Sequence, residues 1–393
     1  MIQIREPKLR FKADDGSEFL EWEEKRLGEV CEYGKRHGTG QNYVGTENMF
    51  SAFGGVIIEN TESECNGILY SSGDILMSNI RPYLKKVWLA DREGVCSTDV
   101  LVFRPIKIES EYLYSLIASD FFITKVMSAA KGSKMPRGDK KHIMEIPVSV
   151  PSIPEQRKIA SFLSTIDEII QSTESELTAW QERKKGVMQK IFNREVRFKA
   201  DDGSEFPEWE EKKLGELGEF IGGGTPSTKV KEYWKGTTPW VSSSDVSEND
   251  IRQLSASRFI TEEAIEKSAT KRIPENSICI VCRVGVGKVV ITPFELCTSQ
   301  DFVSITALKD DICFLGYAIW NLMQRKISDV RGTSIKGIPV KDLREYMIDV
   351  PFLLEQQKIA DCLSSLDDAI NQIKAELSAW KEFKKGLLQQ MFV

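Results

Sequence analysis

The sequence has few residues of the kinds that build catalytic and metal centres. Histidine occurs only twice, as His37 and His142. Cys279 and Cys282 have the spacing of a zinc pair, but they lie inside the strand-like run SICIVCRV, and the matching run DILMSNIR in the first half has no cysteine. We therefore expect the eight cysteines to be reduced core thiols and expect no metal site. No pair of a nucleophile and a base stands out, so catalysis by this chain is not expected.

Long apolar runs are also missing. None reaches the about 20 residues that a membrane span needs, and the N-terminal segment MIQIREPKLRFK lacks the apolar core of a signal peptide. Length and composition are those of a globular protein with two or three domains. We therefore expect a cytoplasmic protein.

Two weak resemblances to ligand-binding loops are better interpreted as turns. Val289 follows Lys288 in the sequence GVGK, where a Walker A motif requires serine or threonine. The two Asp-Asp-Gly sequences lack the spacing of an EF-hand, and Asp-Gly is an ordinary signal of a tight turn. A methyltransferase would need a glycine-rich cofactor loop and an Asn/Asp-Pro-Pro-aromatic sequence, and the chain contains neither.

The net charge of -6 comes from two short stretches. Residues 10–29 and 197–216 each carry four basic and seven acidic residues, so each contributes -3 and the rest of the chain sums to zero. A nucleic-acid-binding protein is expected to be basic. The local acidity therefore neither excludes nor supports such a protein.

The chain is a tandem repeat. Residues 10–29 return as 197–216 with only two substitutions, and PSIPEQRKIASFLSTID returns as PFLLEQQKIADCLSSLD at an offset of two hundred residues. Between these matches the copies diverge but keep one order, in which β-like runs are followed by an amphipathic helix, expected over 110–130 and 313–331. This order predicts a duplicated mixed α/β domain. The predicted division is a linker with a first globular domain (1–150), a long helix (151–193), a linker with a second globular domain (194–350), and a second long helix (351–393).

Each repeat ends in a long stretch that favours one uninterrupted helix. After Pro154 neither proline nor glycine occurs until Gly186, and apolar residues recur at steps of four and three, interrupted only at Thr173 and Lys184. This heptad spacing, over 153–192 and again over 352–392, predicts two helices that pair with each other. The lysine-rich segments 181–185 and 381–385 are interpreted as solvated faces. The residues expected to pair the helices are Leu163, Ile166, Ile170, Leu177, Trp180, Leu363, Leu366, Ile370, Leu377 and Trp380.

Several loops have the composition of a nucleic-acid contact. The segments after the two amphipathic helices are basic, contain glycine and are rich in hydroxyl groups, which suits phosphate contact, although a solvated loop is the alternative. Segments 45–48, 225–227 and 239–245 offer short polar side chains that can read base edges, while Trp234 and Trp240 are expected in the core. The candidate DNA-binding residues are Lys35, Arg36, His37, Thr46, Glu47, Asn48, Arg81, Lys131, Ser133, Lys134, Arg137, Thr225, Ser227, Ser242, Ser243, Ser244, Arg283, Arg331, Thr333, Ser334 and Lys336.

The whole arrangement resembles the specificity subunits of type I restriction–modification systems. The resemblance is carried by Pro151 with the following EQRKIA, by Pro351 with EQQKIA, by GGTPS at 223–227 and by PWVS at 239–242. It implies two target-recognition domains, each reading half of a bipartite site in double-stranded DNA, and two long antiparallel coiled-coil helices that separate them with pseudo-twofold symmetry.

The resemblance also implies partners. A specificity subunit is not catalytic and binds no cofactor. It docks two methyltransferase (M) subunits that use S-adenosylmethionine and, where present, two restriction (R) subunits that use ATP and Mg. A non-catalytic coiled-coil adaptor and the specificity part of a related methylation-based defence system are the alternatives, whereas a fused nuclease is disfavoured by the missing motifs.

Overall fold

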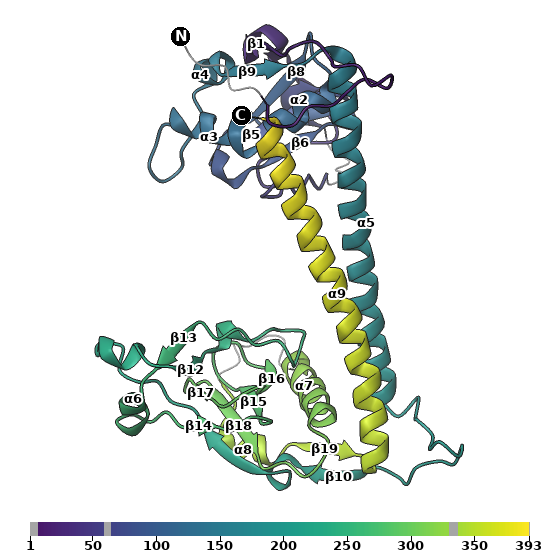
Figure 1. Ribbon diagram of the computed structural model, residues 1–393, viewed down its shortest axis with the longest axis vertical. Coiled ribbons are helices and arrows are strands. Elements are labelled where there is room, and N and C mark those ends of the chain that lie inside the picture. The colour runs from purple at the N-terminus through teal and green to yellow at the C-terminus, as the bar shows by residue number, and fades with distance from the viewer. Residues whose placement is uncertain (1–6, 59–63, 330–336, 393) are drawn as a thin grey trace. The chain divides into compact units, whose positions relative to one another are not determined.

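The computed structural model describes residues 7–58, 64–329 and 337–392, and it divides the chain into two compact units. Unit 1 comprises Met1–Ser175 with Ala375–Val393, and unit 2 comprises Glu176–Lys374. The helices α5 (Ile153–Phe192) and α9 (Leu353–Met391) each contribute one part to each unit (Figure 1). Both long helices expected from the sequence are therefore present, with ends within one residue of the prediction.

Unit 1 is built on three sheets. A four-stranded antiparallel sheet has the order β2–β8–β5–β6, a three-stranded sheet has the order β3–β4–β7, and β1 pairs with β9. The bounds are β1 Glu23–Arg26, α1 Leu27–Val30, β2 Cys31–Tyr33, β3 His37–Gly40, β4 Cys65–Tyr70, β5 Ile75–Ser78, η1 Pro82–Leu84, β6 Val87–Leu89, β7 Gly94–Cys96, β8 Val100–Pro105, α2 Ser110–Ile117, α3 Asp120–Ser128, α4 Lys140–Glu145 and β9 Pro147–Val150.

Unit 2 repeats this frame. The sheet β11–β18–β15–β16 has the connectivity of β2–β8–β5–β6, and β10 pairs with β19 as β1 pairs with β9, while the remaining sheet, β13–β12–β17–β14, differs. The bounds are β10 Glu210–Lys213, η2 Leu214–Glu216, β11 Glu219–Gly222, η3 Lys231–Trp234, β12 Thr238–Val241, η4 Ser243–Asp245, β13 Arg258–Ile260, α6 Glu262–Glu266, β14 Arg272–Ile273, β15 Ile278–Val281, β16 Val289–Ile291, β17 Leu296–Thr298, β18 Phe302–Thr306, α7 Ile312–Asp329, α8 Val340–Arg344 and β19 Met347–Val350. The expected mixed α/β fold is confirmed.

Cys279 and Cys282 are both buried, as expected of core residues. All four residues of β15, which contains Cys279, are buried, and the Cys279 Sγ lies 3.1 Å from the Ser304 hydroxyl oxygen on β18. Burial raises the pKa of the Cys279 thiol to about 12, because the thiolate would be desolvated there. A buried thiol held protonated in this way packs as a small apolar group.

One helix expected in unit 1 is in fact two. The sequence predicted a single amphipathic helix over 110–130, but α2 ends at Ile117 and α3 begins at Asp120. Ser119 causes the break because its hydroxyl accepts a hydrogen bond from Phe122 N at 3.2 Å and so caps a new helix. In unit 2 the corresponding helix α7 is continuous.

The repeated Glu-Gln pair at the start of each long helix has a structural role. Glu155 is fully buried and its carboxylate binds the Arg10 guanidinium at 3.1 Å, just as Glu355 binds Arg197 at 2.9 Å. A buried carboxylate needs such a partner, so each linker is tied to the first turn of its own helix. Trp209 Nε1 adds a second donor to Glu355 at 3.2 Å.

The glutamine of this pair joins each helix to the domain beside it. The Gln156 Oε1 accepts from Glu109 N at 2.9 Å while its Nε2 donates to Pro151 O at 2.8 Å. Gln356 makes the same two bonds, to Asp311 N and Pro351 O. The Glu-Gln pair that recurs in both repeats therefore fixes the start of each long helix.

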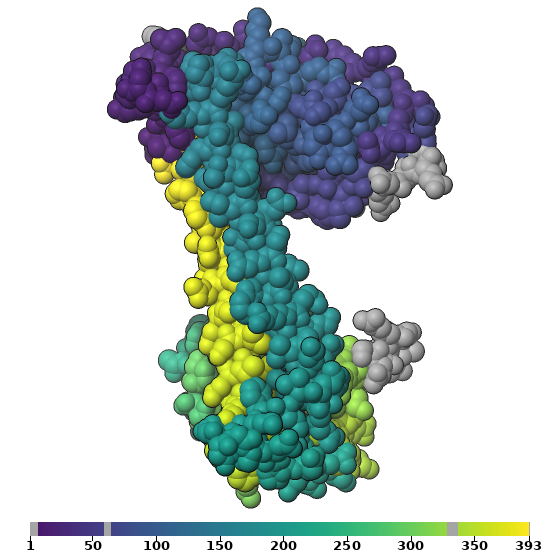
Figure 2. Space-filling view, turned by 90° about the vertical axis from the view of Figure 1, so that its right-hand side faces the viewer, coloured from purple at the N-terminus to yellow at the C-terminus, as the bar shows by residue number. Residues whose placement is uncertain are grey.

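The helices α5 and α9 lie side by side within each unit, as both views show (Figures 1 and 2). In unit 1, Lys384 pairs with Asp167 and Lys381 with Glu174 at 2.6 Å, which is the order of antiparallel helices. In unit 2, Lys184 pairs with Asp367.

The expectation that Lys184 interrupts the heptad seam on a solvated face is wrong. Its side chain is only 8% exposed, and it can be buried because the Asp367 carboxylate on the other helix balances its positive charge. Thr173 is buried too, with its hydroxyl donating to Ile169 O.

Burial of the apolar seam is uneven. Four of the ten residues expected to pair the helices are buried and six are half-buried. Buried are Leu163, Ile166, Leu363 and Ile370, and half-buried are Ile170, Leu177, Trp180, Leu366, Leu377 and Trp380.

Candidate nucleic-acid interface

Three loops of unit 1 lie at the same end of its four-stranded sheet. Lys35 follows β2, residues 79–86 follow β5, and residues 97–99 precede β8. Because β8 is antiparallel to both β2 and β5, the start of β8 and the ends of its two neighbours meet at one edge. This edge therefore gathers Lys35 and Arg81, which the sequence singled out separately.

Unit 2 has the same loop cluster. Asn79 N donates to Asp99 O at 2.8 Å in unit 1, and Cys282 N donates to Asp301 O at 2.7 Å in unit 2. The segment after the first strand is bonded to the neighbouring strand in both units, because Gly34 N donates to Val102 O and Gly223 N donates to Phe302 O. Lys35, Arg36 and His37 follow β2 as the segment that contains Thr225 follows β11. The strands β15 and β16 confirm that GVGK lies in a strand-to-strand turn.

Each cluster contains a short turn capped by its own side chain. In unit 1, Gly45 N donates to Asn48 Oδ1 at 2.8 Å. In unit 2, Ser242 N donates to Asp245 Oδ2, also at 2.8 Å. We call 45–48 and 242–245 the recognition turns. The amide oxygen of Asn48 is used within its own turn.

A lysine from the neighbouring loop holds each recognition turn. Lys86 Nζ donates to Thr46 O at 2.7 Å, and Lys288 Nζ donates to Ser243 O at 3.2 Å. Sequence reasoning missed this pair. The available signal was that both lysines immediately precede the corresponding strands, β6 and β16.

Arg258 gives the unit 2 turn a further contact. Its guanidinium binds the Ser242 hydroxyl and the Asp245 carboxylate, the latter at 2.9 Å, and lies 4.4 Å from the ring centroid of Trp240. Burial raises the pKa of Asp245, but the hydrogen bonds from Ser242 and the charge of Arg258 outweigh it and hold that pKa below its ordinary value. Trp240 is buried, as expected of a core residue. Ser242 is therefore committed to the turn, and the hydroxyl of the exposed Ser244 lies 2.9 Å from the Ser242 hydroxyl.

The basic loop after α3 joins the cluster in unit 1. Arg81 N donates to Pro136 O at 2.8 Å, so the two loops meet. Lys131 pairs with Asp139 at 2.6 Å, and the hydrogen bond from Lys131 lowers the pKa of Asp139 to about 2. The structure thus brings Arg81 beside this loop, while part of the positive charge of Lys131 is already balanced.

The remaining expected contacts divide by exposure. Exposed are Lys35, Arg36, His37, Glu47, Arg81, Lys131, Ser133, Lys134, Arg137, Ser227, Ser244 and Arg283, and half-buried are Thr46, Asn48, Thr225, Ser242 and Ser243. Arg331, Thr333, Ser334 and Lys336 lie outside the described residues. Their neighbour Ile338 donates from its backbone N to Cys282 O at 2.7 Å, as Gly138 does to Asn79 O.

Among residues 7–58, 64–329 and 337–392, no group of three or more His, Cys, Asp or Glu side chains could hold a metal ion. In the same part of the chain, no helix is long and apolar enough to cross a membrane.

Comparison with known proteins points to one family. The model described as "Type I restriction modification DNA specificity domain" matches residues 20–179 and again 207–379. The MjaIX specificity subunit of Methanocaldococcus jannaschii is 34% identical over 51% of this chain and 48% of its own length. The EcoR124I/EcoR124II specificity subunit of Escherichia coli is 31% identical over 58% of this chain and 57% of its own. The chain thus spans about half the length of these two relatives.

A solved structure agrees in fold. The type I restriction–modification system S subunit from M. genitalium has a TM-score of 0.60 at 15% identity, covering 99% of both chains. At that identity the likeness concerns the fold alone.

Proposed function

Since the chain belongs to the family of type I restriction modification DNA specificity domains, we propose that it directs a methyltransferase complex to a bipartite DNA sequence, one half read by each unit. The relatives named above are specificity subunits, which supports a role in recognition without catalysis. Two recognition units on one chain suit a target of two half-sites, because half-site separation follows the geometry of the protein.

The pair of lysine-held recognition turns carries this proposal. Lys86 and Lys288 hold equivalent turns in equivalent frames, yet the turns read Gly-Thr-Glu-Asn in unit 1 and Ser-Ser-Ser-Asp in unit 2. A fixed backbone with different polar tips is what two different base sequences require, since Asn, Glu, Ser and Thr side chains discriminate base edges. Exposed cations of the same cluster, such as Arg81 and Lys134, suit the flanking phosphates.

The proposal includes partners. Two methyltransferase (M) subunits with S-adenosylmethionine would carry out the chemistry, and restriction (R) subunits with ATP and Mg would join where the system cleaves DNA. The antiparallel pair of α5 and α9 would act as the spacer between half-sites. The half-buried Leu177, Trp180, Leu377 and Trp380 leave apolar surface on these helices for a partner helix.

Adenine methylation across the genome tests the proposal. Cells that carry this gene with its methyltransferase gene should show a gapped two-part methylated motif that is lost when this gene is deleted. A DNA-independent adaptor predicts no change in any motif. An unchanged pattern, together with no DNA binding by the purified complex, would refute the recognition role.

Exchange of one domain tests the division of labour. Replacing residues 217–350 with the corresponding domain of a relative should change one half of the motif and leave the other half and its spacing intact. If both halves changed, independent reading by the two units would be wrong.

A further inference from the structure

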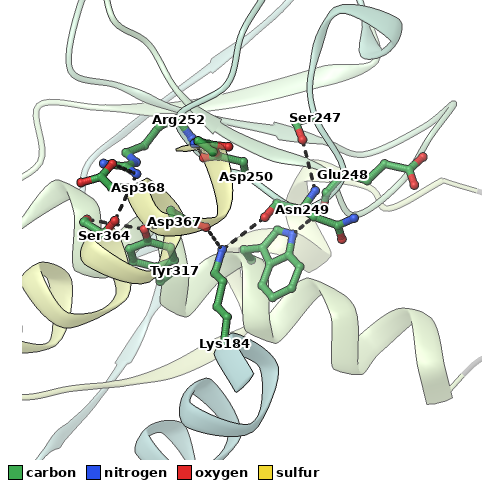
Figure 3. A network of polar contacts seen from close by, with 12 residues as sticks. Lys184, Ser247, Glu248, Asn249, Asp250, Arg252, Tyr317, Ser364, Asp367 and Asp368 are labelled. Atoms are coloured by element: carbon green, nitrogen blue, oxygen red, sulfur yellow. Dashed lines mark hydrogen bonds and ion pairs between the residues drawn. The ribbon is translucent and has the colours of Figure 1, made fainter. Parts of the chain in front are cut away.

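In unit 2, residues 248–252 contact both long helices (Figure 3). Lys184 of α5 donates from Nζ to Asp367 Oδ1 of α9 at 2.5 Å and to Asn249 O at 3.2 Å. The side chains of Lys184 and Asp367 are 8% and 2% exposed, so the ammonium group depends on protein acceptors in place of water. The backbone of Asn249 thus completes a buried ion pair between two helices.

The helix α7 closes the network from a third side. Tyr317 donates its hydroxyl to Asp367 Oδ2 at 2.6 Å, and its ring centroid lies 5.3 Å from Lys184 Nζ. Trp320 Nε1 donates to Glu248 O at 3.0 Å. Consecutive carbonyls, those of Glu248 and Asn249, are therefore held by side chains of two different helices.

The next residues attach the segment to α9. Asp250 is 2% exposed, and its Oδ2 accepts from Asn371 Nδ2 at 2.8 Å. Arg252 reaches the same helix, where its guanidinium donates to Asp368 Oδ1 at 2.7 Å and to Ser364 O at 3.3 Å. Both contacts lie on the face of α9 next to Asp367.

The anchored segment belongs to the same closed loop as the recognition turn. Ser255 N donates to Asp245 O at 3.0 Å, and Val246 forms a bridge with Leu254, so residues 242–255 fold back on themselves. One end of this loop presents the turn, and the other end is fixed on the helices. A shift of the anchored end would therefore move the turn.

Unit 1 retains only part of this arrangement. Lys384 and Asp167 repeat the ion pair at an offset of two hundred residues, but their side chains are 21% and 42% exposed. The position of Asn371 is taken by Gln171, which is exposed. The matched residue in the other helix therefore offers a control.

We propose that Asp250, Arg252 and Asn371 are positioning residues that lock the recognition turn of unit 2 to the helix pair, so that both the base discrimination of the second half-site and the allowed spacer length depend on them. This inference rests on the proposed function. Hydrogen bonds to base edges require donor–acceptor distances of about 2.7–3.2 Å, so a turn free to shift by a fraction of an ångström loses discrimination.

The test uses the assembled methyltransferase complex with Asn371→Ala or Arg252→Ala, and with Gln171→Ala as the control. Methylation rates are measured on DNA with single-base substitutions in either half-site and with spacers one base pair longer or shorter. At the second half-site the preference for the cognate base should fall about tenfold in both variants, as expected for a lost hydrogen bond to a charged group. The first half-site should change less than about twofold, within the additivity of distant sites. Altered spacers should become substrates, and Gln171→Ala should match the wild type.

Arg252→Lys separates positioning from folding, because it keeps the cation that faces Asp368 and should regain most of the discrimination. Equal losses at both half-sites, or unchanged discrimination in folded variants while the wild type reads a gapped motif, would overturn this inference alone. A wild-type complex that reads no gapped motif would overturn the proposed function and this inference together.

Discussion

Lys184 Nζ lies 2.5 Å from Asp367 Oδ1 although 183 residues separate them in the chain, and Lys384 meets Asp167 in the matching place of the other repeat. The first pair is buried, at 8% and 2% exposure, whereas the second is partly open, at 21% and 42%. Removing one partner of a buried ion pair leaves an uncompensated charge, and the cost falls as water reaches the remaining group. One repeated pair thus has two different energetic roles.

Replacing Lys184 with Met should destabilise unit 2 strongly. Asp367 would stay buried without its cation, which costs about 3–5 kcal/mol when a buried pair is broken. Urea unfolding followed by tryptophan fluorescence measures the loss. Lys384→Met is the matched control and should cost much less, and Lys184→Met combined with Asp367→Asn should recover most of the stability. Equal losses for the two lysine variants would contradict the difference in burial.

The loss of unfolding free energy in Lys184→Met should depend on pH in a defined direction. Burial raises the pKa of Asp367 above its ordinary value, even though Lys184 opposes this. Without the lysine the pKa rises further, and a folded-state pKa above the unfolded value stabilises the protein at low pH and ceases to do so as the pH rises through the folded pKa. The stability lost in Lys184→Met should therefore be smallest at a pH near the ordinary pKa of aspartate and should grow as the pH rises above it. A deficit that shrinks on raising the pH would show that Asp367 is not the titrating group.

Substitution of the linker arginines should reveal a difference between the units. Arg197→Gln leaves the buried Glu355 with Trp209 Nε1 as a hydrogen-bond donor. The corresponding Trp22 Nε1 has no hydrogen-bond partner in the described chain, so Arg10→Gln leaves Glu155 without an indole donor. Arg10→Gln should therefore cost about 2–3 kcal/mol, and Arg197→Gln less, in urea unfolding of the respective unit.

The exposed linker lysines provide the control for this comparison. Lys199 pairs with Glu205 at 3.8 Å with both side chains largely exposed, so Lys199→Ala should leave the unfolding transitions unchanged. A larger loss for Arg197→Gln than for Arg10→Gln would contradict the role of the indole.

Reciprocal variants test the recognition turns. Lys86→Gln should relax base discrimination only at the half-site read by unit 1, and Lys288→Gln only at the other, because each lysine holds the carbonyl of one turn. The expected loss is about five- to tenfold for one hydrogen bond donated by a charged group. Methylation rates on DNA with single-base substitutions give the result. A loss that appears at both half-sites in either variant would refute the assignment of one turn to each half.

The basic loop of unit 1 should contribute to affinity without contributing to specificity. Lys134 is exposed in the loop that meets Arg81, so Lys134→Ala should weaken binding of all DNA sequences alike. The slope of log affinity against log salt should become shallower by about 1, the value for one phosphate contact. Binding of the methyltransferase complex to labelled DNA at several salt concentrations measures the slope. Lys12→Ala, in the linker where Lys12 pairs with Glu18, should leave it unchanged.

Much of the fold could be predicted because it depends on local sequence patterns. The absence of proline and glycine after Pro154 and the heptad spacing are properties of consecutive residues, and α5 begins and ends where they predict. The break between α2 and α3 was not predicted, because the apolar pattern continues across it. The local signal for the break is Ser119, which caps α3. The predicted domain boundaries and the DNA contacts of the loops stay predictions.

Repetition and periodicity were enough to predict a repeat of two mixed α/β domains with two long helices, since neither needs any knowledge of contacts. Which charged side chains are buried, and which groups they bind, became known only from the folded chain. Lys86 reaches Thr46 across 40 residues, and Lys184 reaches Asp367 across 183. No periodic pattern encodes such partners, because a charge can enter the interior only where the fold brings its counter-charge or a carbonyl to the same point.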